Sequence, residues 1–305
     1  MDGRLTFLGT GTSMGVPTVG CGCAVCTSTD PRDRRLRPSV LVRWNDPTLK
    51  PLSDPPFPRE ELQEAGSSTP LCFAQNDSWM GFGANVGHPV MERVVVIDTG
   101  PDFREQALRN RLKRVDAVFY THSHADHIFG LDDLRPLSFV AAREGGPIPL
   151  YASPETTAVL EHIYEYTFSP EATYPMRARV QLEPLVARIE VHGVEFIRVP
   201  VMHGEMEIAG FRFGNAAYLT DVSSIPEESF ALLEGLEVLV VSALRHKPHP
   251  SHATVDQAVG WARRIGARQT FFTHIAHELG HEATNRSLPA GMALAYDGLE
   301  LAVSL

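Results

Sequence analysis

Short apolar runs separated by glycine and proline predict a chain that is rich in β-strands. Leu5 and Phe7 alternate with polar residues before the glycine turn of residues 9–12, and another strand is predicted at 39–44. The run from Val94 is continuously apolar, as in a buried strand, and ends in Asp98. Further strands are predicted at 115–120, 189–199, 212–219, 238–242 and 269–273, with a final strand or hairpin at 293–303.

Three stretches have apolar residues at helical spacing, namely 102–112, 155–166 and 254–265. In the last of them, four apolar residues spaced three and four apart fall on one face, which predicts an amphipathic helix. Strands therefore alternate with helices, and the predicted fold class is α/β or α+β. We find no internal repeat, and we interpret residues 1–305 as a single domain.

The segment from about residue 45 to 93 interrupts this pattern. It is rich in proline, glycine and serine and has little periodicity. We interpret it as a long surface insertion. The alternative is a lid or substrate-recognition loop, because long loops in compact domains are often functional.

Composition and charge narrow the function classes. Hydrophobic residues make up 43% of the 305 residues, which is enough for a core. The formal net charge of −10 disfavours a general nucleic-acid binder, which carries a basic surface. There is no recognisable signal peptide and no apolar run of the roughly 20 residues that a bilayer span needs, so we expect a cytoplasmic protein without a membrane partner.

Three of the four cysteines, Cys21, Cys23 and Cys26, lie within six residues, and Cys72 stands alone. In a reducing compartment such spacing favours a metal site over a disulfide. The alternative, three buried thiols, does not account for the tight spacing.

The sequence from His122 to His127 has the pattern H-x-H-x-D-H and follows an apolar strand directly. Three imidazoles and a carboxylate this close need hydrogen bonds or a metal if they are buried. Imidazole and carboxylate together suit zinc, manganese or iron. A histidine-rich surface turn is the alternative, and it is weakened by further candidate ligands downstream: His203, Asp221 and His274 each follow an apolar strand.

With these residues the chain resembles the metallo-β-lactamase superfamily. The resemblance implies a four-layer αββα sandwich with two active-site metals, zinc or manganese. One metal would be held by His122, His124 and His203, and the other by Asp126, His127 and His274. Asp221 would bridge the two, and Asp98 would orient a ligand from behind.

A closer resemblance is to the phosphoribosyl cyclic phosphate phosphodiesterase branch, which is related to the tRNA 3′-processing endonucleases. It is carried by the glycines of residues 9–15, by Val16-Pro17 and by the cysteine cluster. In that branch the three cysteines share a structural zinc with a histidine three residues after the last active-site histidine. Here that residue is His277. The long 45–93 segment and residues 131–134 depart from the branch.

The same resemblance places a general acid at His252, with Asp126 as the other catalytic residue. His252 could instead pack at the start of the helix at 254–265, and His246 and His249 lie close enough in sequence to be confused with it. Arg135 could reach a substrate phosphate, and a solvated or ion-paired arginine is the alternative.

The predicted function is therefore a binuclear metal-dependent hydrolase, acting on a small or cyclic phosphodiester. Two metals can share a hydroxide nucleophile and clamp the phosphoryl oxygens. Hydrolysis of a thioester, lactone or β-lactam, a nuclease for RNA or DNA ends, and a non-catalytic metal-binding protein are the alternatives. The predicted partner is a small-molecule substrate and not a nucleic acid, with a homodimer left open.

Overall fold

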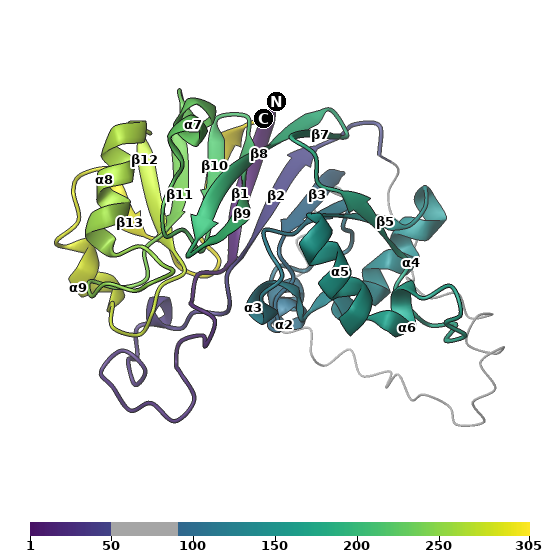
Figure 1. Cartoon of the computed structure of the whole chain (residues 1–305), viewed down its shortest axis with the longest axis horizontal. Coiled ribbons are helices and arrows are strands. Elements are labelled where there is room, and N and C mark those ends of the chain that lie inside the picture. Colours follow the sequence, from purple (N-terminus) through teal and green to yellow (C-terminus); the bar gives the residue numbers. More distant parts are fainter. Residues whose placement is uncertain (50–90) are drawn as a thin grey trace, which may run out of the picture.

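The computed structural model describes residues 1–49 and 91–305. Strands in these residues form two sheets of seven that pack face to face (Figure 1). The first sheet has the order β14-β1-β2-β3-β4-β5-β6 and contains β1 (Asp2–Gly9), β2 (Ser39–Asn45), β3 (Glu92–Ile97), β4 (Ala117–Phe119), β5 (Ile148–Ala152), β6 (Val180–Pro184) and β14 (Glu300–Ser304).

The second sheet has the order β13-β12-β11-β10-β9-β8-β7. It contains β7 (Arg188–Val191), β8 (Val194–His203), β9 (Met206–Phe213), β10 (Ala216–Leu219), β11 (Val238–Ser242), β12 (Gln269–Thr273) and β13 (Met292–Leu294). Half of each sheet is parallel, since β3 to β6 run parallel in the first sheet and β10 to β13 in the second.

Helices cover the outer face of each sheet (Figure 1). On the first sheet lie α2 (Phe103–Arg109), α3 (Ala125–Ile128), α4 (Arg135–Glu144), α5 (Pro154–Ile163) and α6 (Glu165–Phe168). On the second lie α7 (Glu227–Phe230), α8 (Val255–Ile265) and α9 (His281–Asn285). The four-layer αββα sandwich that the family resemblance implies is confirmed.

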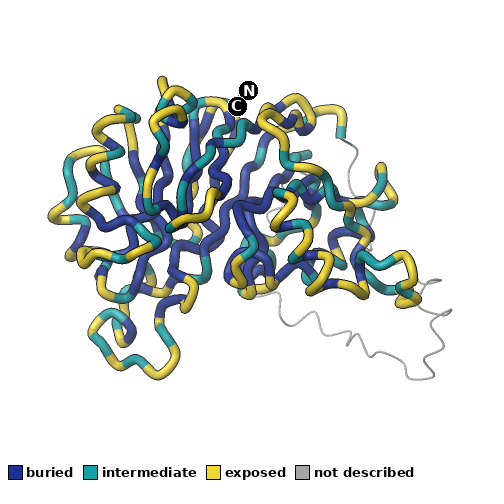
Figure 2. The backbone as a smooth tube through the Cα atoms, in the orientation of Figure 1, coloured by how far each residue is buried: buried dark blue, intermediate teal, exposed yellow. Residues whose placement is uncertain are grey.

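Three apolar clusters hold the layers together. The central cluster lies between the sheets, where Phe119 of β4 stacks on Phe196 of β8 with ring centroids 4.7 Å apart. The other two lie between each sheet and its helices. The strands are accordingly buried along most of their length, while the outer sides of the helices are exposed (Figure 2).

Two predicted strands are each two strands in the structure. The run at 189–199 turns at His192 and Gly193, whose φ angles of 48° and 82° reverse the chain between β7 and β8. The run at 212–219 turns at Gly214, which has a φ of 53° and separates β9 from β10. In both cases apolar residues continue on either side of the turn, so the pattern hides it.

The final strand or hairpin predicted at 293–303 is in fact two strands that do not pair with each other, β13 and β14. β13 pairs with β12 in the second sheet, whereas β14 pairs with β1 in the first. The chain crosses between the sheets at residues 295–299 and closes the sandwich. Hydrophobic alternation does not specify which sheet a strand joins, so the two strands look like neighbours in sequence.

The other elements agree with the prediction to within a few residues at most ends. The helix predicted at 254–265 is α8, and Thr254 caps it by accepting from the Gln257 backbone N–H. The helix predicted at 155–166 is α5 followed by α6. α4, β5 and β6 were not predicted, because their apolar runs are short.

The proline-rich segment predicted as an insertion at about 45–93 lies mostly outside the described residues. Its described edges are the end of β2 at Asn45 and the start of β3 at Glu92, which pair with each other. Among the helices in the described part of the chain, none combines the length and apolar character needed to cross a bilayer.

Candidate metal centre

The histidine-rich motif lies where the two sheets meet. It begins in the loop after β4, and its last residues form α3. The last residue of β8, His203, and the loops that follow β10 and β12, with Asp221 and His274, meet at the same place. Ligand sites in α/β sheets lie beyond the carboxyl ends of the parallel strands, and this site follows that rule.

Three residues around the site have left-handed backbone conformations. Asp98, Asp221 and His274 have φ angles of 65°, 57° and 53°, and each directly follows a strand or lies one residue beyond it. Such conformations are costly for residues other than glycine and cluster at functional sites. The sharp turn at each strand end places these three side chains at the candidate metal centre or against one of its ligands.

One ligand group consists of His122, His124 and His203, whose nitrogens lie within 4.8 Å of one another. Nε2 of His122 lies 3.0 Å from Nδ1 of His124. Nδ1 of His203 is 2.8 Å from two backbone carbonyl oxygens, those of Asp221 and Ser251. Because Nδ1 of His203 carries the proton toward these carbonyls, its Nε2 is free to bind a metal.

The second group consists of Asp126, His127, Asp221 and His274, all buried. Nε2 of His127 lies 3.2 Å from a carboxylate oxygen of Asp126 and 3.2 Å from one of Asp221. Nε2 of His274 lies 3.1 Å from the other oxygen of Asp221 and 3.7 Å from Asp126. Asp221 thus contacts both histidines, one with each oxygen.

Several buried ligand atoms of this second group lack hydrogen-bond partners among the described residues, although Oδ2 of Asp221 accepts from the Thr220 hydroxyl. Oδ2 of Asp126, Nε2 of His127 and both ring nitrogens of His274 are unpaired. Unpaired buried polar atoms are rare in folded proteins and each needs an explanation. Here they converge on one another, and a divalent cation that accepts nitrogen and oxygen ligands would satisfy them together. The residues fit a metal site.

Burial and mutual charge shift the pKa values of these groups strongly. Burial lowers the pKa of His122 well below its usual value, so its ring is neutral. Burial also acts to lower the pKa of His127, but the carboxylates of Asp126, Asp221 and Asp98 outweigh it and raise that pKa well above its usual value. Burial acts to raise the pKa of Asp221, but the adjacent rings of His274 and His127 outweigh it and hold that pKa well below its usual value.

Asp98 lies behind the centre, as the sequence predicts. Nδ1 of His127 donates to Oδ2 of Asp98 over 2.7 Å. Thr121 completes the contact, since its backbone N–H donates to Oδ1 of Asp98 and its hydroxyl to Oδ2, each over 2.8 Å. Thr121 was not singled out in the sequence, where it is one residue in a strand end and carries no separate signal.

His252 lies at the edge of the centre. Its ring stacks on that of His274 with centroids 4.7 Å apart, and its Nδ1 is 3.7 Å from a carboxylate oxygen of Asp221. His249 packs beside it at 4.9 Å between centroids, whereas His246 is exposed. The geometry therefore favours His252 over both neighbours. His203, Asp221 and His252 also lie close enough to form a further group of possible ligands.

Arg135 is engaged elsewhere. Its guanidinium lies 3.4 Å from the carboxylate of Asp132 and donates to the hydroxyl of Tyr174 over 3.1 Å. The ion-paired alternative is therefore the one the structure shows, and Arg135 is not part of the ligand groups.

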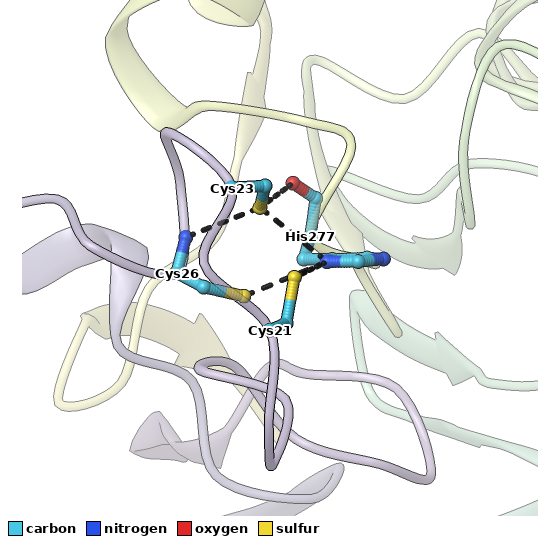
Figure 3. Close-up of side chains that lie close together, drawn as sticks. All are labelled: Cys21, Cys23, Cys26 and His277. Carbon is cyan, nitrogen blue, oxygen red and sulfur yellow. Dashed lines mark hydrogen bonds between the residues drawn. The ribbon is translucent and has the colours of Figure 1, made fainter.

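The cysteine cluster and His277 form a further group of possible ligands, separate from the two at the candidate centre (Figure 3). Nδ1 of His277 lies 3.2 Å from Sγ of Cys21 and 3.5 Å from those of Cys23 and Cys26. The three thiols are free, and the three sulfurs and the ring nitrogen all lie within 4.8 Å of one another, as the four corners of a closed tetrahedral site do. Loops far apart in sequence, at residues 21–26 and 277, supply the four atoms.

The environment of the cluster favours a thiolate at one position. The backbone N–H of Cys26 donates toward Sγ of Cys23 and lowers the pKa of Cys23 to about 6. Burial instead raises the pKa of Cys26 to about 11. Zinc binds the thiolate form, so binding would release the remaining protons.

The cluster is tied to the active-site side of the molecule by a buried arginine. Arg35 pairs with Asp33 at 3.0 Å and donates to the carbonyl oxygens of Ala276 and Leu279. The loop that carries the cysteines is thereby held against the loop that carries His277.

Comparison with known families gives a match that begins in β3 of the first sheet and ends just after β12 of the second sheet. The profile of the family described as β-lactamase superfamily domain matches residues 93–275. This range contains both groups of candidate active-site ligands.

Individual relatives extend the comparison to the whole chain. A crystal structure of a diphosphatase from the PhnP family is 48% identical, with a TM-score of 0.78, and the alignment covers 99% of this chain and 97% of that one. An octanoyltransferase of Porphyromonas gingivalis is 32% identical over 302 residues, which is 97% of this chain and 51% of the relative. The chain thus spans about half the length of that relative. A ribonuclease Z of Staphylococcus saprophyticus is 31% identical over 97 residues, 26% of this chain and 32% of the ribonuclease.

Proposed function

Because the chain belongs to the β-lactamase superfamily and is a hydrolase of the metallo-β-lactamase fold, we propose that it is a binuclear metal-dependent phosphodiesterase. The observation that carries the proposal is the convergence of buried, unpaired nitrogen and oxygen atoms around Asp221, whose two oxygens face different histidines. The likeness to a diphosphatase over nearly the whole chain supports a phosphorus-containing substrate.

In this proposal two divalent ions, zinc or manganese, occupy the two ligand groups. His122, His124 and His203 would hold one, and Asp126, His127 and His274 the other, with Asp221 between them. Such ions lower the pKa of water and stabilise negative charge that develops on phosphoryl oxygens. Asp98 and Thr121 keep His127 in the tautomer that presents Nε2 to the centre.

His252 supplies the proton that the leaving group needs. Its ring lies against His274, at the edge of the centre, and its Nδ1 has no hydrogen-bond partner in the described part of the chain. Burial lowers the pKa of His252, so the ring is neutral before substrate binds. A phosphodiester anion beside it acts in the opposite direction and favours the protonated acid.

Asp126 has a second role besides binding a metal. Oδ2 of Asp126 lies between the Nε2 atoms of His127 and His274, which keep its carboxylate ionised although burial opposes this. An ionised carboxylate at this position can orient a water molecule toward phosphorus by accepting its proton in a hydrogen bond.

The cysteine cluster with His277, formed by Cys21, Cys23, Cys26 and His277, is proposed to hold a structural zinc. A site with three sulfurs and one nitrogen has no open position for substrate. Free thiols at this site fit a reducing compartment, so we infer a cytoplasmic location.

Two other substrates have one observation each in their favour. The match to one half of an octanoyltransferase favours an acyl thioester or another carboxylic ester. The partial match to a ribonuclease Z favours an RNA end. The formal charge of −10 speaks against RNA, because binding a polyanion requires a basic surface.

One screen separates these activities. Metal-loaded protein is assayed against a phosphodiester, an octanoyl thioester, a lactone and a short RNA with a 3′ extension. The proposal predicts that turnover of the phosphodiester exceeds the others and is abolished by a chelator. Preferential hydrolysis of the thioester would overturn it. Preferential RNA cleavage that weakens steeply with salt would replace the small substrate with a nucleic acid.

A further inference from the structure

A cavity of about 380 Å³ adjoins the candidate metal centre. His122 belongs to a ligand group and also to the cavity wall, so the cavity lies directly beside the candidate centre. The walls come from the end of β4, from the start of α5 and from the β8–β9 hairpin. A cavity of this volume is in the range of small-molecule binding sites.

Charged groups in the cavity wall are arranged around one arginine. Nη2 of Arg198 donates to a carboxylate oxygen of Glu207 over 2.6 Å. Nε of Arg198 is buried and has no hydrogen-bond partner among the described residues. Nε is closed off from solvent, so the N–H groups at the end of the guanidinium, beyond the one that binds Glu207, are those that can donate to a ligand.

A second carboxylate, that of Glu155, also belongs to the cavity wall. The backbone N–H of Glu155 and the Ser153 hydroxyl lower the pKa of Glu155, and the charge of Arg198 lowers it further. Glu155 is therefore ionised at neutral pH and lies within the field of Arg198. With Arg198, Glu155 and Glu207 as its charged side chains, the cavity has a net negative charge.

The rest of the wall is mixed. Ser123 and Ser153 add hydroxyl groups, and Leu185 and Ile208 add apolar surface. Carboxylates and hydroxyls accept hydrogen bonds from alcohols, while the guanidinium donates to them. An additional phosphate or carboxylate on the ligand would meet two like charges.

We propose that this cavity binds the organic group attached to the scissile phosphate, and that Arg198 and Glu207 select an uncharged group that carries several hydroxyls, such as a polyol. The inference rests on the proposed phosphodiesterase function and specifies the substrate class of the same site. Arg198 and Glu207 are specificity residues here and take no part in the proton transfers.

The test compares the 4-nitrophenyl phosphodiesters of glycerol and of propanol, which have the same carbon chain and differ in hydroxyl groups. The wild type should have the higher kcat/KM on the glycerol ester. Arg198→Met and Glu207→Gln should each lower the ratio of the two kcat/KM values by about tenfold, as expected for a lost hydrogen bond to a charged group. The change should be in KM more than in kcat.

A matched pair on the neighbouring β7–β8 hairpin serves as the control. Arg188 and Glu195 form an exposed ion pair that lies outside the cavity wall. Arg188→Met and Glu195→Gln should leave the ratio at its wild-type value. A third ester, in which the propyl chain ends in a carboxylate, should be a poor substrate for the wild type and a better one for Glu207→Gln.

A binding measurement without turnover complements the kinetics. Equilibrium titration with glycerol 1-phosphate and propyl phosphate should give a lower Kd for the former, and Arg198→Met should remove the difference. Unchanged ratios and Kd values in both cavity variants would overturn the inference while leaving the phosphodiesterase intact. If the wild type hydrolyses neither ester, the proposed function fails and the substrate assignment fails with it.

Discussion

Nδ1 of His127 and Oδ2 of Asp98 are 2.7 Å apart, and both side chains are fully buried. The pair joins the end of β3 to α3 and sets the direction in which Nε2 of His127 points. Both oxygens of Asp98 are occupied, since Thr121 donates to each of them. The orientation of one candidate ligand thus depends on a carboxylate that does not itself reach the centre.

Asp98→Asn should weaken metal binding without changing the shape of the side chain. The amide nitrogen cannot accept from His127 or Thr121, so the tautomer and orientation of His127 are lost. Replacement of such supporting groups typically costs roughly 10- to 100-fold in metal affinity. Competition with a chromophoric chelator measures this. Asp102→Asn, which removes a charge paired with Arg37, is the control and should bind metal like the wild type. If Asp98→Asn also binds metal with the affinity of the wild type, the role assigned to Asp98 is contradicted.

Cys23→Ser should lose one zinc and lower the melting temperature, because a hydroxyl is a poor zinc ligand and the loop at 21–26 would lose its anchor to His277. His277→Gln should have the same effect from the other side of the site. Elemental analysis and thermal unfolding are the measurements. A zinc content equal to that of the wild type in both variants would show that the cluster is not a metal site.

Asp297 predicts a pH dependence of stability outside the metal centre. Burial raises its pKa to about 6, although it accepts hydrogen bonds from Thr10 and from the Leu36 backbone N–H. The folded protein therefore binds this proton more tightly than the unfolded chain, whose aspartate pKa is about 3.9. The associated stabilisation is complete below about pH 3.9 and is lost as the pH rises to about 6, an effect of about 3 kcal/mol.

Denaturant unfolding of the wild type and Asp297→Asn at pH 4 and pH 7.5 isolates this contribution. The difference in the free energy of unfolding, wild type minus variant, should be roughly 2 kcal/mol smaller at pH 7.5 than at pH 4, where the unfolded aspartate is already about half ionised. Other titrating groups are common to both proteins and cancel. The same difference at both pH values would mean that Asp297 titrates normally.

The sequence predicted much of the site because the ligand residues follow strands. The motif at 122–127 and the positions of Asp221 and His274 could be found from apolar runs that end in a polar residue, and the structure brings these residues together. The family match confirms the resemblance drawn from them. The cysteines and His277 also meet as expected, although they are separated by most of the chain.

The parts that the sequence did not predict depend on contacts between distant segments. The Gly214 turn and the crossing from β13 to β14 are hidden because apolar alternation continues through them. Arg198 and Glu207 are ordinary strand residues in sequence, and only the pairing of β8 with β9 and the approach of α5 place them in one cavity.

His252→Ala should slow hydrolysis in proportion to how poor the leaving group is. An alkoxide needs a proton in the transition state, whereas a nitrophenolate hardly does. The variant should therefore lose roughly 10²-fold or more on a dialkyl phosphodiester and far less on a nitrophenyl diester. Its metal content should equal that of the wild type. Equal losses of activity on both diesters, together with a lost metal, would make His252 a metal ligand and not the acid. The next variant to measure would then be His249→Ala, because the ring of His249 packs against that of His252.

The central claim is a two-metal centre that depends on Asp221 and hydrolyses phosphodiesters. It is tested most directly by measuring metal content and phosphodiester turnover together, in the wild type and in Asp221→Ala. The account predicts about three metal ions per chain in the loaded wild type, two at the active site and one at the cysteines. Asp221→Ala should keep the fold and the cysteine-bound zinc but have no measurable turnover. At most one metal in the loaded wild type, or wild-type turnover in Asp221→Ala, would contradict it.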